Sequence, residues 1–175
     1  MGIMKNKKSI VVFILGVAAC IIVLAIATLM LPSRVSVAKS VVIKASPQKV
    51  MSQLDNFSSW RNWYPPMQKE EVQAITNGPS QITLKDQQGK QVNMQMRTAK
   101  PDTVEVQLLS GSAQPVNYLF LLRKQQDGDA LLTLNVNTQY NWYSLQKIRG
   151  VFQDKISGPQ YDQVLRQIKK VAEQP

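Results

Sequence analysis

Few side chains in this sequence of 175 residues are able to perform covalent chemistry. The chain contains no histidine and one cysteine, Cys20, which excludes Ser–His and Cys–His nucleophilic pairs and sites that bind zinc through imidazole groups. The groups that remain as acids or hydrogen-bond donors include Tyr118, Tyr140, Tyr161 and Arg97. From this set we predict no catalytic residue, no metal site and no cofactor.

Charged residues give the chain a formal net charge of +10. An excess of this size suits anionic surroundings such as lipid head groups. No basic run after the N-terminal segment is longer than two residues, as in Lys169-Lys170, so the pattern does not indicate nucleic acid as a partner. Two acidic pairs, Glu70-Glu71 and Asp127 with Asp129, fall in expected turns or strand edges and do not indicate an acid–base pair.

An uncharged apolar segment covers residues 10–31 and follows a basic stretch, residues 1–9. As a helix it would be about 33 Å long, which matches the hydrocarbon thickness of a bilayer. Short basic flanks tend to stay in the cytoplasm. We therefore predict a single-pass anchor in the bacterial inner membrane, with the N-terminus cytoplasmic and the remaining chain outside, in the periplasm or the extracellular space.

Three other interpretations of the apolar segment fit the sequence less well. A cleaved signal peptide has an apolar region of about 7–15 residues, which is shorter than this one. Val17-Ala18-Ala19-Cys20 resembles a bacterial lipobox, in which the cysteine becomes lipidated and forms the new N-terminus. A lipoprotein continues with a polar tether, whereas here the chain stays apolar after Cys20. A buried core helix that is apolar on every side is a poor fit to a small domain, so the uncleaved anchor is favoured.

The sequence after Pro32 predicts one strand, two short helices, about six strands and a long helix. Residues 34–45 are rich in β-branched side chains and indicate a strand. Ser46-Pro47 supplies an N-cap and a first-turn proline for a helix, and Pro65-Pro66 ends a second one. The inward faces of these helices carry residues at helical spacing: Val50, Met51, Leu54, Phe57, Trp60 and Trp63 or Tyr64. We expect the two tryptophans to close and brace one end of the sheet.

Segments joined by short turns then predict an antiparallel meander with one apolar face. They cover residues 70–75, 81–85, 91–97, 103–108, 116–124 and 130–140.

The C-terminal part of the chain has a helical period, with an apolar stripe from Leu145 to Val171. Pro159 is predicted to kink this helix or to start a new one capped by Ser157. One apolar face of the sheet must be covered, and this helix is the only large element available to cover it. The fold class is therefore α+β: a helix-grip fold, with a curved antiparallel sheet around a long C-terminal helix, preceded by one transmembrane helix.

The segment SVVIKASPQKVMSQLDNFSSWRNWYPP resembles the N-terminal signature of the START-like (SRPBCC) superfamily, which includes Bet v 1-like folds. It is most similar to the bacterial polyketide cyclase/dehydrase and lipid transport group, where a run of the form DF-x-x-W-x-x-W-x-P is matched here by Asn56-Phe57, Trp60, Trp63 and Pro65. LQKIRGVFQDKISGPQYDQVLRQIKKVAE resembles the final helix of that group. The resemblance covers residues 34–173, although relatives often carry tryptophans where this chain has leucines in two strands.

This resemblance implies a domain over residues 34–175 that holds a hydrophobic small molecule or lipid between sheet and helix. Alternation along the strands and spacing along the helix give the candidate lining: Met94, Met96, Val106, Tyr118, Phe120, Leu134, Val136, Phe152 and Tyr161. Each of these side chains also fits an ordinary core.

The function we favour from the sequence is therefore a membrane-anchored binding domain. A non-enzymatic accessory protein of the cell envelope is the first alternative, and a cyclase or dehydratase is the least favoured.

Overall fold

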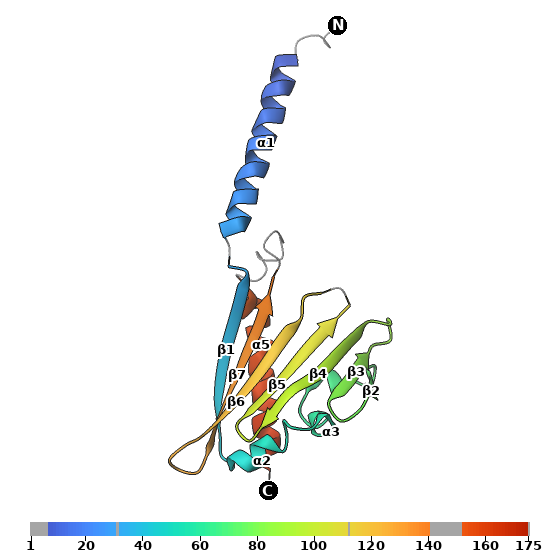
Figure 1. The fold of residues 1–175 in the computed structure, drawn as a ribbon, viewed down its shortest axis with the longest axis vertical. Helices are drawn as coiled ribbons and strands as arrows, with labels where there is room; N and C mark the ends of the chain where they lie inside the picture. Colours follow the sequence, from blue (N-terminus) through green and yellow to red (C-terminus); the bar gives the residue numbers. More distant parts are fainter. Residues whose placement is uncertain (1–6, 31, 112, 141–151, 175) are drawn as a thin grey trace.

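Seven strands among the described residues form one antiparallel sheet in the order β1-β7-β6-β5-β4-β3-β2 (Figure 1). The computed structural model describes residues 7–30, 32–111, 113–140 and 152–174. The strands are β1 (Arg34–Ile43), β2 (Gln73–Thr76), β3 (Gln81–Lys85), β4 (Gln91–Lys100), β5 (Thr103–Ser110), β6 (Val116–Lys124) and β7 (Ala130–Gln139). Strand β1 pairs with β7 along its whole length. The first strand of the domain therefore lies next to the last strand of the meander.

The strands place alternate side chains on the two faces of the sheet, as the period of two requires. In β7 the buried residues are Ala130, Leu132, Leu134, Val136 and Thr138, while the residues between them are partly exposed. In β4 the pairing register with β5 shifts between Met96 and Thr98. Such a bulge bends its strand and contributes to the curvature of the sheet.

Between β1 and β2 the chain forms α2 (Pro47–Met51), α3 (Phe57–Trp60) and the 3₁₀ turn η1 (Pro65–Met67). The Ser46 Oγ accepts a hydrogen bond from the Lys49 N–H at 3.3 Å, which confirms the predicted cap and the first-turn proline that follows it. Asn56 caps α3 in the same way, since its Oδ1 accepts the Ser58 N–H at 2.8 Å.

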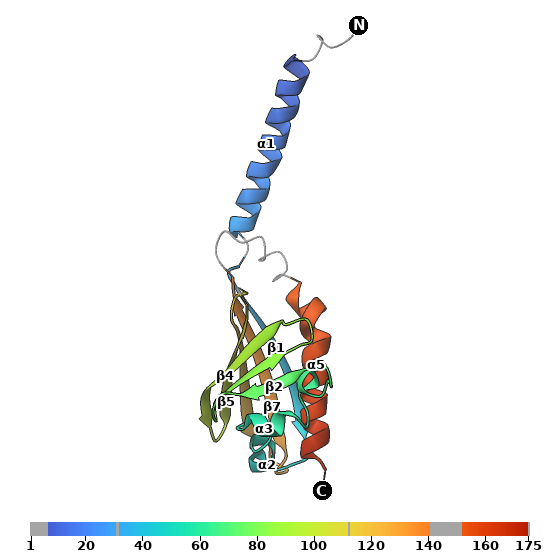
Figure 2. The same ribbon diagram turned by 90° about the vertical axis from the view of Figure 1, so that its right-hand side faces the viewer.

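Helix α5 (Gln153–Ala172) lies across one face of the sheet (Figure 2). Its buried side carries Tyr161, Val164, Leu165, Ile168 and Ala172. The sheet with this C-terminal cover is the helix-grip arrangement that the sequence predicted.

Some details of the prediction were wrong. The second short helix, α3, ends at Trp60, and Pro65-Pro66 begin the 3₁₀ turn η1 instead of ending a helix. Of the two alternatives for Pro159, the new helix capped by Ser157 is contradicted, because α5 runs through Pro159 with Ser157 inside it. A proline removes one hydrogen-bond donor from the helix. The helix continues through Pro159 because the packing of its apolar side on the sheet offsets the lost hydrogen bond. The first strand of the meander begins at Gln73, later than predicted. The early part of the predicted C-terminal stripe, residues 145–151, falls outside the described residues.

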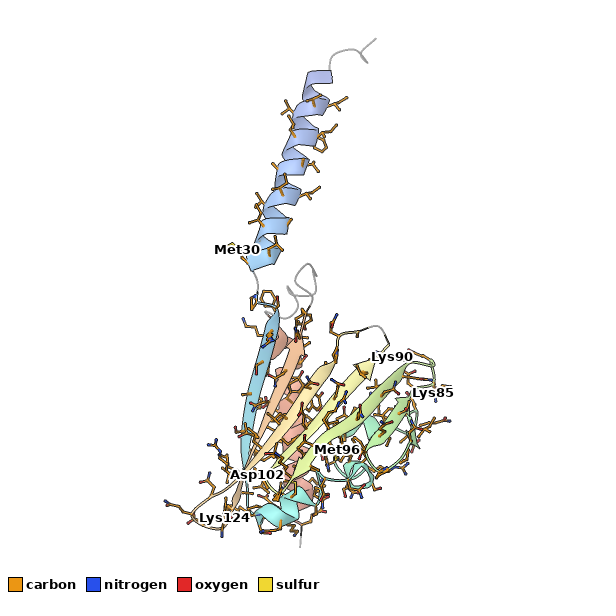
Figure 3. The ribbon with its side chains drawn as sticks, viewed as in Figure 1. Met30, Lys85, Lys90, Met96, Asp102 and Lys124 are labelled. Carbon is orange, nitrogen blue, oxygen red and sulfur yellow. The ribbon has the colours of Figure 1, made fainter. Side chains whose placement is uncertain are left out.

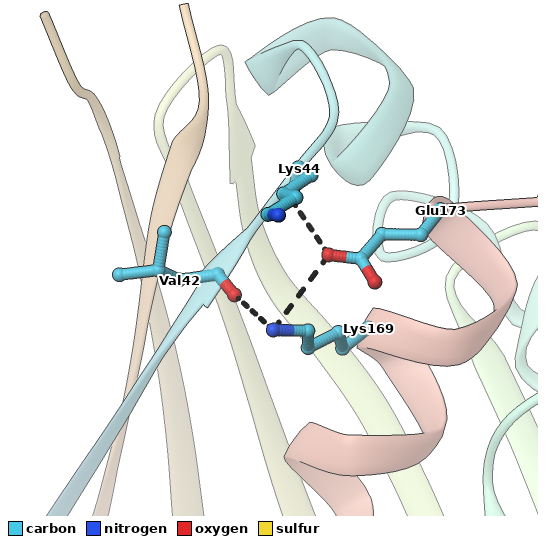
Figure 4. A network of polar contacts seen from close by, with 4 residues as sticks. All are labelled: Val42, Lys44, Lys169 and Glu173. Atoms are coloured by element: carbon cyan, nitrogen blue, oxygen red, sulfur yellow. Dashed lines mark hydrogen bonds and ion pairs between the residues drawn. The ribbon is translucent and has the colours of Figure 1, made fainter. Parts of the chain in front are cut away.

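Polar contacts fasten the C-terminal end of α5 to the end of β1 (Figure 4). The Lys44 backbone N–H donates to Glu173 Oε1 at 2.7 Å, and Lys169 Nζ donates to the Val42 carbonyl at 2.9 Å. Lys169 and Glu173 form an ion pair at 3.7 Å, one helical turn apart. Together with Lys39 Nζ, which lies 4.0 Å from Asp162 Oδ2, these contacts show that β1 and α5 run side by side in the same direction.

Helix α1 (Lys7–Met30) precedes the domain and is apolar on all sides from Ile10 onward (Figure 3). Residues 10–27 have a mean hydropathy of 3.3, and none of them is buried against the rest of the protein. Among the described residues this is the one helix long and apolar enough to cross a membrane, and its position near the N-terminus also fits a signal sequence.

Candidate ligand-binding site

An aromatic cluster fills the interior where α3 meets the sheet. The rings of Trp60 and Trp63 are 4.5 Å apart between centroids, and Phe120 of β6 meets them edge-on at 5.9 and 6.2 Å. Both indoles are fully buried, and both indole N–H groups are satisfied: Trp60 Nε1 donates to the Leu54 carbonyl at 3.0 Å and Trp63 Nε1 donates to the Gln53 carbonyl at 2.8 Å. This cluster confirms the predicted inward position of the tryptophans and makes them part of the core.

A cavity of about 320 Å³ lies beside this cluster and is partly open to solvent. It is bounded by the middle of α5, by the chain from Tyr64 to Lys69 and by β6. Its lining residues are Tyr64, Pro65, Pro66, Lys69, Tyr118, Gln160, Tyr161, Gln163 and Val164. The volume is at the lower end of the range of roughly 300–1,000 Å³ for ligand pockets.

Three tyrosines form the inner part of this cavity. The Tyr118 ring meets the Tyr161 ring edge-on at 6.1 Å between centroids, and the side chains of Tyr64 and Tyr118 are hydrogen-bonded to each other. Burial raises the pKa of Tyr64 to about 12, although the hydrogen bond with Tyr118 opposes this rise. Burial also raises the pKa of Tyr118 well above its ordinary value. Both phenols therefore stay protonated and neutral at physiological pH.

The raised pKa values predict a loss of stability at alkaline pH. A tyrosine whose pKa is higher in the folded than in the unfolded chain contributes stability below the unfolded value of 10.0, and that stability is lost as the pH rises toward 12. We expect the free energy of unfolding, measured by urea denaturation, to fall across this interval. The Tyr64→Phe, Tyr118→Phe double variant should show a flatter profile, and an equally steep one would contradict the assignment.

The structure brings two of the nine predicted lining residues to this cavity, Tyr118 and Tyr161. Six others belong to the core or pack against it: Met94, Met96, Val106, Phe120, Leu134 and Val136. Phe152 lies apart from the others, with half of its side-chain surface exposed at the start of α5. It precedes Tyr161 by nine residues, or about two and a half helical turns, and so points away from the sheet.

Sequence reasoning missed most of the cavity wall. Tyr64 belonged to the aromatic run, and Gln160 and Gln163 flank the stripe that carries Tyr161 and Val164. Their positions next to inward-facing residues were the only sign in the sequence that these side chains could line a cavity. For Lys69 no local pattern pointed to a binding role, because the fold of the preceding loop brings it to the cavity.

A sequence model of the family described as polyketide cyclase / dehydrase and lipid transport matches residues 34–173. The chain belongs to this family. The match begins at the first residue of β1 and ends one residue beyond α5. It therefore covers the sheet, the cavity wall and the covering helix, and it leaves α1 outside the family domain.

Solved structures share the fold of this polyketide cyclase/dehydrase and lipid transport domain. A START superfamily protein from Mycobacterium smegmatis aligns with a TM-score of 0.59 at 16% identity, over 79% of this chain and 97% of that one. XoxI from Bacillus cereus aligns with a TM-score of 0.59 at 11% identity, over 78% and 94%. The di-domain ARO/CYC protein BexL of the BE-7585A biosynthetic pathway aligns with a TM-score of 0.56 at 13% identity, over 82% and 51%.

These likenesses confirm a START-like α+β fold, whose seven-stranded sheet and C-terminal helix suit the binding of a hydrophobic ligand. No curated protein sequence matches the chain.

Proposed function

We propose that residues 34–175 bind a hydrophobic small molecule or lipid in the cavity beside α5, and that α1 anchors this domain in the membrane. In this proposal residues 1–9 lie in the cytoplasm and the domain lies on the outer side of the bacterial inner membrane. The observation that carries the binding proposal is the cavity of about 320 Å³ between α5, β6 and the chain from Tyr64 to Lys69. Membership of a family whose description includes lipid transport supports it.

The cavity wall offers separate surfaces to the two ends of an amphipathic ligand. Pro65, Pro66 and Val164 provide apolar surface, and the tyrosine rings add more. Lys69, Gln160 and Gln163 offer polar groups to a carboxylate, phosphate or hydroxyl on the ligand. An apolar wall with a few placed polar groups is the usual composition of a small-molecule site.

A second candidate, an accessory protein of the cell envelope, is favoured by the packing of the interior. Trp60, Trp63 and Phe120 occupy the space between α3 and the sheet. Several side chains predicted to line a pocket instead belong to the fully buried core. If the cavity takes no ligand, the domain keeps a START-like fold that serves protein contacts.

Filling the mouth of the cavity separates these two candidates. We expect Gln160→Trp to weaken binding of a fluorescent fatty acid to the purified domain at least about tenfold, because the indole would occupy ligand space. Arg166→Trp is the matched control, since Arg166 is exposed on the same helix and does not line the cavity. Native mass spectrometry of the unmodified domain should show a bound lipid.

Absence of both the lipid adduct and fatty-acid uptake would favour the accessory protein. Equal loss of binding in the two variants would place the ligand elsewhere.

A further inference from the structure

The first turn of α5 exposes two large apolar side chains. Phe152 is 50% exposed and Ile156 is 61% exposed. They lie four residues apart and therefore on the same side of the helix. Lys155 is exposed beside them. Isolated exposed apolar residues are ordinary, whereas an apolar pair next to a lysine on one turn is the composition of a surface that contacts lipid.

Contacts between α5 and β1 show which part of β1 lies beside this turn. Lys169 contacts Val42, and Asp162 contacts Lys39. The helix from 162 to 169 and the strand from 39 to 42 are each about 10 Å long, so α5 and β1 advance together. Phe152 precedes Asp162 by ten residues, which places it roughly 15 Å farther along. The same distance along β1 from Lys39 reaches the first residue of that strand. The first turn of α5 is therefore level with the start of β1 (Figure 2).

The start of β1 is also where α1 joins the domain. Helix α1 ends at Met30 and β1 begins at Arg34, so their ends are at most about 14 Å apart. The Ser33 carbonyl accepts a hydrogen bond from the Tyr140 N–H at 2.7 Å, which already ties the chain to the sheet before β1 begins. The short connection limits how far this end of the domain can move away from α1.

We propose that the first turn of α5 is a second membrane contact, in which Phe152 and Ile156 enter the interface of the bilayer that α1 spans. Lys155 then lies among the lipid phosphates. This inference rests on the proposed anchoring by α1. The opposite end of the domain, which carries Asp102 and Lys124, faces away from the bilayer (Figure 3).

This orientation connects the contact to the proposed ligand site. Tyr161 follows Phe152 by nine residues, so the cavity lies roughly 14 Å along α5 from the membrane-facing turn. A lipid that leaves the bilayer beside α5 would travel a short distance along the helix to reach the cavity.

Depth-dependent fluorescence quenching of the full chain in lipid nanodiscs tests this contact. In a Cys20→Ser background, single variants Phe152→Cys, Ile156→Cys, Lys124→Cys and Ile14→Cys each carry an environment-sensitive dye. Nanodiscs of neutral and anionic phospholipids contain a nitroxide either near the head group or deep in the acyl chain. We expect the shallow nitroxide to quench dyes at 152 and 156 at least about twofold, the deep nitroxide to quench the dye at 14, and neither to quench the dye at 124.

The quenching pattern distinguishes loss of the second contact from loss of the anchor. Dyes at 152 and 156 that behave like the dye at 124, while the dye at 14 is quenched deeply, would overturn the second contact and leave the anchor intact. A dye at 14 that is not quenched would overturn the anchor together with this contact. As a further check, a dye on Lys155→Cys should be quenched by the shallow nitroxide and should lose that quenching in a Phe152→Ser, Ile156→Ser background.

Discussion

Trp60→Ala is expected to lower the free energy of unfolding of the domain by about 3–5 kcal/mol. The Trp60 indole is fully buried and contacts the rings of Phe57, Trp63, Tyr64 and Phe120 at centroid distances of 4.5–5.9 Å. Alanine would leave a cavity that these rings cannot refill together. Urea denaturation followed by circular dichroism measures the change without depending on the fluorescence of the removed indole.

Two further variants test which property of Trp60 accounts for the lost free energy of unfolding. Trp60→Phe keeps much of the ring but leaves the Leu54 carbonyl without the indole N–H that it accepts at 3.0 Å, so we expect a smaller loss of about 1–3 kcal/mol. Ile156→Ala is the matched control at an exposed position, with an expected change within about 0.5 kcal/mol. An unfolding midpoint for Trp60→Ala equal to that of the unmodified domain would refute the role of the cluster in the core.

The second large effect is expected in the N-terminal helix. Leu15→Arg together with Ala19→Arg should move the protein from the membrane pellet to the supernatant after alkaline carbonate extraction, while the unmodified chain stays in the pellet. Each arginine at the centre of a membrane helix costs roughly 2.5–3.5 kcal/mol on insertion scales, and none of residues 10–27 is buried against the described part of the protein to compensate for that cost. Leu15→Val with Ala19→Val is the matched control and should remain in the pellet.

The same extraction distinguishes an anchor from the processed forms. Cys20→Ser should stay in the pellet with the mass of the complete chain, because the anchor needs no lipid on Cys20. In the unmodified protein, a mature chain that begins at Cys20 and carries lipid would show that the segment is a lipoprotein signal. A shorter mature chain without lipid would show a cleaved signal peptide.

Local pattern determined the elements of this protein from the sequence alone. The alternation in 130–140 predicted β7, and Ser46 followed by a proline predicted the start of α2, because each signal depends on neighbours within one strand or one turn. Trp60 and Trp63 were correctly placed inside the fold, since helical spacing and size leave few other places for such rings. The family resemblance at the two ends of the domain was confirmed by the match over residues 34–173.

Only the tertiary structure decided which inward-facing residues are core and which line a cavity. Tyr118 and Phe120 lie two residues apart on the same face of β6, yet Tyr118 lines the cavity and Phe120 is sealed by the indoles of α3 and the loop after it. Periodicity gives both the same face, and the distinction depends on residues more than fifty positions away in the sequence. Phe152 is exposed and Tyr161 lines the cavity for the same reason. The packing of α5 on β1 fixes which side of the helix faces the sheet, and the apolar composition of the helix alone does not.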